Sequence, residues 1–424
     1  MSTNAPPAGS ARLPYIDALR GVAVLLMILL HAADGWLKPG LKDGLGWMAI
    51  RTLGGQAAPL FLLLAGVGVG IGWSAREASA PDRRADARRT LWSRGLEIVI
   101  AGYALRLAMW WIDSGTILRL PGIVGGGLLA AGYWALWQAL PHRRAKHPRS
   151  PLLWAGAGAA CCVLALLYLA DREPRAHHTL VRVDVLQTIG AAMVIMAVLE
   201  PLIRARAWLA CVLGAAVALL TPVMGALMPG DLPAALAGYV APYQAPPGAA
   251  PSGRFPLFPW LAHALIGTGL GRVLGRAAQR PIAAAGERAA IELAVLGAAI
   301  ALVCCESIPE TASLLVREPW LTPAVRVLYR VGLSMVLAAL CVALASSRMP
   351  GQRSLLALGR ASLAVYCVHL EFAFGLAAEP IRKALGYPGF LLGTVLLVGA
   401  MTAFAQLWLG QRDRLRLPPR PALS

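Results

Sequence analysis

The segment YIDALRGVAVLLMILLHAADGW, residues 15–36, determines how the rest of the chain is interpreted. It is long enough to cross a bilayer, which takes about 20 predominantly apolar residues. It nevertheless contains Asp17, Arg20, His31 and Asp34. Charged side chains are costly inside a membrane span, so those found there usually serve a function. The segment therefore predicts a transmembrane helix that carries part of a functional site.

The composition of the whole chain is also typical of a membrane protein. Of its 424 residues, 58% are hydrophobic and 14% are charged, whereas a soluble domain carries about 25% charged residues. Apolar blocks of about the length of a bilayer crossing recur along the chain. We therefore expect an all-α, polytopic integral membrane bundle and exclude a cytosolic enzyme.

The apolar blocks predict about twelve transmembrane helices. They lie at approximately 15–37, 47–74, 91–112, 118–140, 151–170, 180–200, 207–228, 256–275, 289–305, 323–346, 356–377 and 388–410. The intervening loops alternate between strongly basic and near-neutral or mixed, and basic loops stay in the cytoplasm. This alternation places both termini in the cytoplasm, with residues 1–14 as an N-terminal segment, 15–410 as the transmembrane domain and 411–424 as a basic tail.

The net charge of +18 comes from 39 Lys and Arg against 21 Asp and Glu. Because the excess lies mostly in the basic loops, it indicates membrane topology and contact with anionic lipids rather than nucleic acid. The seven cysteines lie in apolar stretches without a C-x-x-C motif, which disfavours disulfides and a zinc site. The lipid bilayer is the expected partner, no metal is expected, and a homo-oligomer is one of the states that the sequence allows.

The ionisable residues of the first span share one face of the predicted helix. Arg20 and His31 are eleven residues apart, which returns to within about 20° of the same direction after a rise of about 16 Å. Asp17 lies one turn before Arg20 and can pair with it. Asp34 follows His31 by three residues and could orient its imidazole. Asp17, Arg20 and His31 form a stripe from the cytoplasmic end past the middle of the membrane.

This stripe favours catalysis across the membrane, although it also fits other uses. A neutral imidazole is a general base near physiological pH, and a fixed guanidinium suits phosphate or a developing oxyanion. Such a pair fits transfer between a cytoplasmic donor and an external acceptor. A proton-coupled transporter or exporter of a sugar or lipid would use similar residues. For Asp17 and Arg20 alone, an interfacial ion pair that anchors the span is a structural explanation.

Several segments of the chain resemble membrane-bound acyltransferases. DALRG followed by an apolar run and His31 is similar to their first-span signature, an Arg, ten residues and a His. The further similar segments, in chain order, are PLFLLLAGVGVGI (59–71), VDVLQTIGAA (183–192), FPWLAHALIGTGLGR (258–272) and LGRASLAVYCVHLEF (358–372). The chain looks closest to bacterial proteins similar to the catalytic domain of heparan-α-glucosaminide N-acetyltransferase, and the wider acyltransferase-3 group shares the first-span motif.

The resemblance implies acyl transfer from cytoplasmic acetyl-CoA to a hydroxyl or amine of a sugar or cell-envelope glycan, in a bacterial inner membrane. It implies that His31 is the catalytic histidine, with Arg20 and Asp17 as its motif companions. His31 would deprotonate the acceptor or briefly carry the acetyl group. The chain departs from the family pattern at Thr188, where an Arg is usual. This resemblance, together with the lack of a visible internal repeat, disfavours the transporter.

Five further residues are candidates for ligand binding. His369 is expected to line the same cavity as His31, with a packing role as the alternative. Asp184 and Gln187, one turn apart at the external end of a span, predict a rim that binds the acceptor, or a solvated helix start. Arg94 and Arg360, at cytoplasmic span ends, are expected to hold the phosphates of CoA.

The glycines at positions 66, 68, 70 and 72 look superficially like a phosphate-binding loop. No Lys-Ser or Lys-Thr pair follows them, and they lie in a predicted membrane helix. Small residues at this spacing let two membrane helices approach closely. We therefore predict that these glycines pack against another helix.

Overall fold

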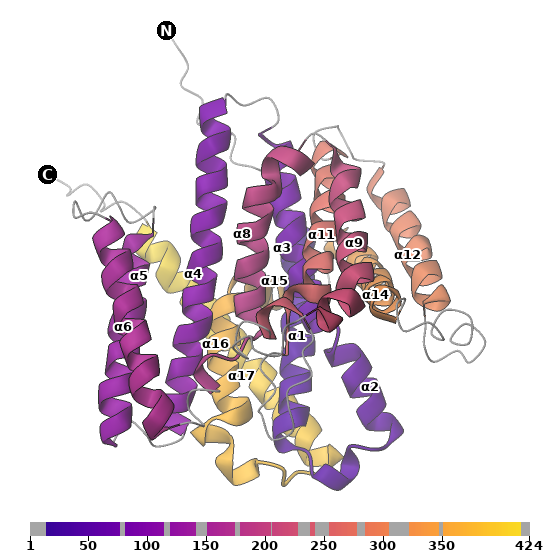
Figure 1. Ribbon diagram of the computed structural model, residues 1–424. Coiled ribbons are helices and arrows are strands. Elements are labelled where there is room, and N and C mark those ends of the chain that lie inside the picture. The colour runs from indigo at the N-terminus through magenta and orange to yellow at the C-terminus, as the bar shows by residue number, and fades with distance from the viewer. Residues whose placement is uncertain are drawn as a thin grey trace, which may run out of the picture.

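The computed structural model describes residues 14–76, 81–113, 119–140, 151–173, 179–204, 206–227, 238–241, 254–277, 285–304, 322–346 and 351–416. Within these ranges the regular elements are helices, and Leu37 forms an isolated β-bridge with Leu385. Many of the long helices run roughly alongside one another (Figure 1). The predicted all-α bundle is therefore confirmed.

The helices follow the predicted apolar blocks along the chain. Their bounds are α1 Pro14–Trp36, α2 Leu45–Gly54, α3 Ala57–Ser74, α4 Pro81–Asp113, α5 Gly127–Ala139, α6 Pro151–Arg172, α8 Val185–Ile203, α9 Ala207–Ala226, α11 Leu257–Ala277, α12 Ala285–Val303, α14 Thr322–Ser346, α15 Gln352–Arg360, α16 Ser362–Phe374 and α17 Tyr387–Arg416. Among the shorter elements of the described residues are η1 Pro39–Leu41, η3 Gly122–Gly126 and η5 Leu376–Ile381.

Among the described residues, eight helices are long and apolar enough to cross a membrane. The count is nine if α15 and α16, which meet at a 90° bend, form one broken span. The remaining predicted spans overlap α4, α5 with η3, and α12. A polytopic membrane protein is thus confirmed, and the number twelve stays a prediction.

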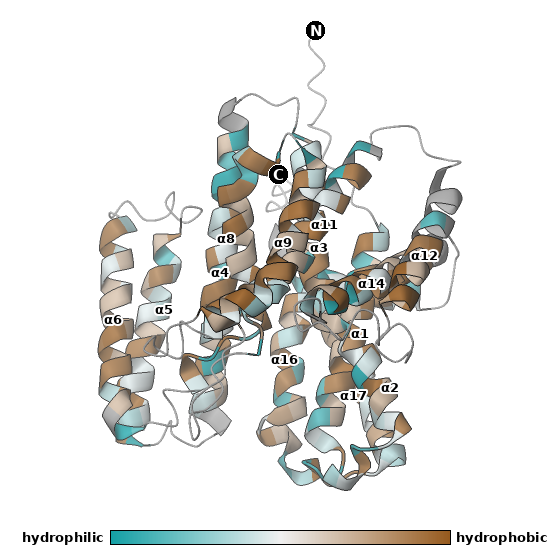
Figure 2. Ribbon diagram, turned by 45° about the vertical axis from the view of Figure 1, so that its right-hand side comes forward, coloured by the Kyte–Doolittle hydropathy of each residue, from teal (hydrophilic) through white to brown (hydrophobic). Residues whose placement is uncertain are grey.

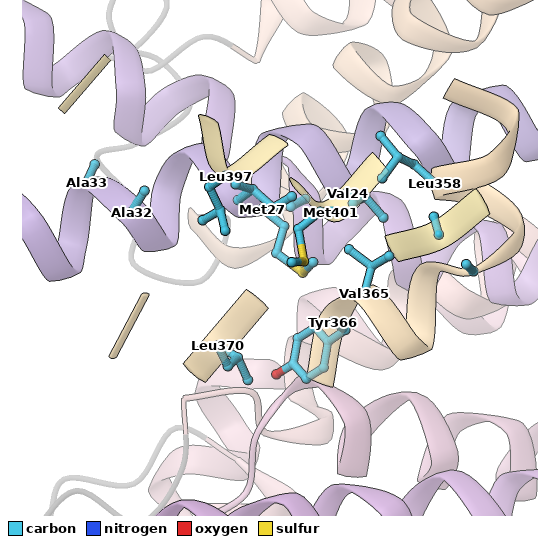
Figure 3. Close-up of a cluster of buried hydrophobic side chains, with 14 of the residues drawn as sticks. Val24, Met27, Ala32, Ala33, Leu358, Val365, Tyr366, Leu370, Leu397 and Met401 are labelled. Carbon is cyan, nitrogen blue, oxygen red and sulfur yellow. The ribbon is translucent and has the colours of Figure 1, made fainter. Parts of the chain in front are cut away.

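Helix α1 lies inside the bundle. It packs against α2, α3, α14, α15, α16 and α17. Its side chains Val24 and Met27 join Val365 of α16 and Met401 of α17 in one buried apolar cluster (Figure 3). Because α1 is surrounded by other helices, much of its polar stripe meets protein rather than lipid.

Other helices expose large apolar side chains at the periphery. Only 17% of the α6 span is buried, against 56% of the α1 span. The exposed side chains on α6 include Leu152, Val163 and Leu167. Figure 2 shows α6 at one edge of the bundle, with much of its ribbon in hydrophobic colours. Such exposed apolar surface fits contact with lipid tails.

Two of the four glycines predicted to pack against another helix do so, where α3 meets α11, whereas Gly68 and Gly72 face the side chains of Arg20 and Arg76. Gly66 and Gly70 of α3 face the backbone of α11, and Gly267 and Gly271 of α11 face the backbone of α3. A Cβ atom added at any of these four positions would overlap a carbonyl oxygen of the facing helix. Reciprocal small-xxx-small spacing of this kind brings two membrane helices into backbone contact.

Replacing a glycine of this interface should therefore destabilise the bundle. For Gly267→Leu we expect a lower midpoint of thermal unfolding in detergent, since overpacking typically costs about 1–3 kcal/mol. The matched control is Gly399→Leu on α17, where an added Cβ meets nothing within 4 Å. Equal unfolding midpoints for the two variants would contradict the packing of α3 against α11.

Candidate active site

Two histidines that lie 338 positions apart in the chain form a pair. The Nδ1 atom of His31, on α1, is 2.8 Å from the Nε2 atom of His369, on α16. The two rings are nearly parallel, with an interplanar angle of 4° and centroids 5.1 Å apart. His369 is fully buried, whereas His31 keeps part of its surface exposed. The structure thus joins two residues that the sequence indicated separately.

The pair forms because α1 and α16 touch through their backbones. Gly35 lies one turn after His31, and a Cβ added there would overlap the carbonyl oxygen of Ala373, one turn after His369. Beside this contact, the Trp36 indole N–H donates a hydrogen bond to the carbonyl oxygen of Phe372 at 3.1 Å. The crossing therefore holds the two imidazoles at hydrogen-bond distance.

The hydrogen bonds of the pair determine which ring nitrogens carry protons. The Nδ1 atom of His369 is 3.0 Å from the carbonyl oxygen of Val365, which can only accept. In a neutral His369, Nδ1 is therefore protonated and Nε2 is an acceptor, so His31 must donate from its own Nδ1. The Nε2 atom of His31 keeps a lone pair, as a base or a nucleophile requires.

Asp34 does not orient His31. The closest charged partner of its carboxylate is Lys42, whose Nζ lies 4.0 Å from Oδ1 and donates to the Asp34 carbonyl oxygen at 2.9 Å. Since His31 Nδ1 meets His369 instead, the expected Asp34–His31 contact is wrong. The predicted pairing of Asp17 with Arg20 is confirmed, with 3.4 Å between Oδ1 and NH1.

A cavity of about 530 Å³ opens between α1, α3, α4, α8 and α16. This volume lies within the range of about 300–1,000 Å³ typical of ligand sites. Its walls are largely apolar, and they carry Arg20, Arg76 and Arg94. Among the described residues that line it, no carboxylate is present. The cavity therefore favours an elongated ligand with anionic groups and an apolar part.

The structure separates the two arginines predicted to hold phosphates. Arg94 lines the cavity, whereas Arg360, at the bend between α15 and α16, is not part of its lining. Arg76 lines the cavity but was not singled out from the sequence. In the sequence, Arg76 is the first basic residue after the span at 47–74. Its charge was attributed to the basic loops that set the membrane topology, so nothing further marked it as a ligand-binding residue.

One lining residue links the cavity to the histidine pair. Tyr366 lines the cavity, and its ring meets the ring of His369 edge-on with centroids 5.6 Å apart. His31 itself is not among the lining residues. Tyr366 thus lies between the cavity and the ring of His369.

Asp184 and Gln187 form the start of α8. The Asp184 carboxylate accepts a hydrogen bond from the Val185 N–H at 3.1 Å, and the Gln187 Oε1 accepts one from the Asp184 N–H at 3.2 Å. Such a capping box satisfies N–H groups that a helix start leaves without partners. Gln187 is fully buried, so it orders the helix start rather than an exposed rim, whereas Asp184 is partly exposed and contacts Arg106.

Comparison with known families finds a match over nearly the whole chain. A family model described as an acyltransferase domain matches residues 13–408. The matched range includes both histidines, the cavity and the whole described bundle up to the last part of α17. No curated protein matches the chain.

The proton positions of the histidine pair can be measured directly. Magic-angle-spinning NMR of the ¹⁵N-histidine-labelled protein should show neutral His31 and His369, each with a proton on Nδ1 and none on Nε2. Assignment uses the single variants His31→Gln and His369→Gln. A proton on Nε2 of either ring, or a cationic ring in the resting protein, would contradict the hydrogen-bond chain from Val365.

Proposed function

The chain belongs to the acyltransferase-3 family of membrane acyltransferases, and from this premise we propose the reaction that it catalyses. It transfers an acyl group, acetyl in the simplest case, from acyl-CoA in the cytoplasm to a hydroxyl or amine of a sugar or cell-envelope glycan. The observation that carries the proposal is the His31–His369 pair together with a cationic cavity, one of whose lining residues, Tyr366, contacts the ring of His369.

The cavity suits the donor. CoA carries phosphates at one end and a long thioester-bearing arm at the other. Arg76 and Arg94 are exposed and line the cavity, so they are available to phosphate oxygens. The apolar walls accept the arm, whose thioester then lies near Tyr366. The bacterial inner membrane, with the basic loops facing the cytoplasm, is the location that this orientation needs.

Arg20 acts on the donor rather than on the reacting carbonyl. Eleven residues separate Arg20 from His31 on one helix, a rise of about 16 Å. A guanidinium at that distance does not touch atoms that react at His31. Its ion pair with Asp17 holds it in place at the cavity wall. A donor whose phosphates lie near Arg20 and whose thioester approaches His31 fits this separation.

The transfer step uses the free lone pair of His31. Nε2 takes the proton of the acceptor hydroxyl or amine, and the acceptor atom attacks the thioester carbonyl. The carbon–sulfur bond breaks, and the CoA thiolate leaves and receives the proton from the imidazolium. Throughout these steps, the Nε2 atom of His369 accepts a hydrogen bond from the Nδ1–H group of His31. This hydrogen bond stabilises the transient positive charge on the His31 ring. An acyl group carried on Nε2 would use the same lone pair and would give ping-pong kinetics.

The nature of the acceptor follows from the finer resemblance of the sequence. Residues 183–192 and 258–272 are similar to segments of bacterial proteins that resemble the heparan-α-glucosaminide N-acetyltransferase catalytic domain. This similarity supports an amino sugar or a sugar hydroxyl as the acceptor. Both groups lose one proton on acylation, so the same base serves either.

Transfer should depend on both histidines, in different ways. With radiolabelled acetyl-CoA and a pool of envelope glycans, we expect His31→Ala to lower transfer about 10²–10⁴-fold, the usual contribution of a general base. His369→Ala should lower it about 10–100-fold, as for a residue that orients a ligand or base. His369→Gln should recover part of the rate, because its amide oxygen can accept the Nδ1 proton of His31.

All variants are compared at equal amounts of folded protein, judged by gel filtration and thermal unfolding. The proposed acyltransferase activity would be overturned if the wild-type protein neither binds acetyl-CoA nor transfers its label, even in vesicles with native lipids. Proton-coupled transport would then be tested. Full activity of His31→Ala would overturn the catalytic role of His31 but leave the proposed acyl transfer intact.

The cavity arginines should affect donor binding more than turnover. For Arg94→Gln and Arg76→Gln we expect the KM for acetyl-CoA to rise roughly 2–10-fold with little change in kcat, as for partly exposed ion pairs. Arg88→Gln is the matched control, since Arg88 is exposed on the same helix as Arg94 and does not line the cavity. An equal rise in KM for Arg88→Gln would contradict a specific phosphate site.

A further inference from the structure

Three arginines and one aspartate gather at the end of the bundle opposite Arg94. We call Arg106, Arg182, Arg254 and Asp184 the distal arginine cluster. Arg106 lies twelve residues beyond Arg94 on α4, about 18 Å further along the helix. Its NH2 atom is 2.5 Å from the Asp184 Oδ2 atom. The cluster therefore lies apart from the arginines of the cavity, toward the face that we predict to be external.

Backbone contacts hold the segments of the cluster together. Arg182 lies two residues before Asp184, which caps α8. The backbone N–H of Arg254 donates to the carbonyl oxygen of Val183 at 3.2 Å. The Thr188 hydroxyl donates hydrogen bonds to the carbonyl oxygens of Asp184 and Phe255. The segment before α11 is thus fixed against the start of α8.

The positive charges of the cluster are not balanced among the described residues. Arg106 pairs with Asp184, but neither Arg182 nor Arg254 forms an ion pair within the described part of the chain. The Nε atom of Arg182 is buried and has no hydrogen-bond partner there. The pKa of Arg182 is lowered, by burial first and then by the charges of Arg254 and Arg106, with Asp184 opposing them.

The cluster also lies close to the histidine pair. The guanidinium of Arg254 is within electrostatic range of His31. Asp184 and Arg106 are within electrostatic range of Tyr366, whose ring contacts His369. An anion bound by these arginines would therefore lie within electrostatic range of the histidine pair that, in our proposal, deprotonates the acceptor.

We propose that the distal arginine cluster binds an anionic group of the acceptor, so that the acceptor is an acidic or phosphate-bearing glycan rather than a neutral sugar. Guanidinium groups bind carboxylate, phosphate and sulfate through paired hydrogen bonds. Capping of α8 requires only Asp184 and Gln187, and Arg106 pairs with Asp184; neither contact accounts for Arg182 and Arg254. This inference rests on the proposed acyl transfer.

The charge of the labelled product tests the inference. Envelope glycans are offered with radiolabelled acetyl-CoA to the full-length protein in vesicles, and the products are separated by anion exchange. Some label is incorporated by the wild-type protein but not by His31→Ala. We expect the anion-exchange column to retain this label, because the acetylated product is anionic. Extraction into organic solvent then distinguishes a phosphate of a lipid carrier from an acidic group on a soluble glycan. Label in neutral glycans alone would overturn the inference and leave the proposed function intact.

Variants of Arg182 test whether the distal arginine cluster binds the anionic acceptor. Arg182→Gln should raise the KM for the anionic glycan fraction about tenfold with a smaller change in kcat, and Arg182→Lys should recover part of this. Arg172→Gln is the matched control, because Arg172 is exposed at the end of α6 on the same side. An unchanged KM in folded Arg182→Gln would overturn the inference. Absence of any transfer that depends on His31 would overturn the proposed function, and this inference with it.

Discussion

The close backbone contact of α1 with α15 and α16 is the constraint on which the site depends. An added Cβ at Gly21 would overlap α15, one at Gly359 would overlap α1, and one at Gly35 would overlap α16. Membrane helices lack a hydrophobic force that drives them together, so such contacts rely on small residues and van der Waals packing. This packing brings His31 within 2.8 Å of His369.

The histidine pair solves the problem of placing a base inside a membrane protein. A buried polar group without a partner costs free energy, and here each donor meets an acceptor in a chain that ends at the carbonyl oxygen of Val365. Within the two rings, this series of hydrogen bonds leaves one nitrogen lone pair without a partner, on His31 Nε2, where it can accept a proton. In the proposed mechanism, a neutral histidine takes the place that a carboxylate often holds behind a catalytic imidazole, without adding a negative charge to the bundle.

The residues around the His31–His369 pair differ on the side of the pair that faces each end of the bundle. On one side, the cavity combines the positive charges of Arg76 and Arg94 with largely apolar walls. On the other side, Arg106 and Arg254 place positive charge near the pair. Two cationic regions with a base between them fit a reaction whose substrates arrive from opposite faces of a membrane.

The sequence alone determined the membrane bundle, the helices that follow its apolar blocks, the Asp17–Arg20 pair and the glycine packing of α3, because hydropathy and spacing within one helix are local properties. Only the tertiary structure decided the partner of His31, since His369 lies 338 positions away and is brought near by a helix crossing. It likewise placed Asp34 with Lys42 and buried Gln187 in a helix cap. Which polar groups meet depends on how helices cross, and no local pattern encodes those crossings.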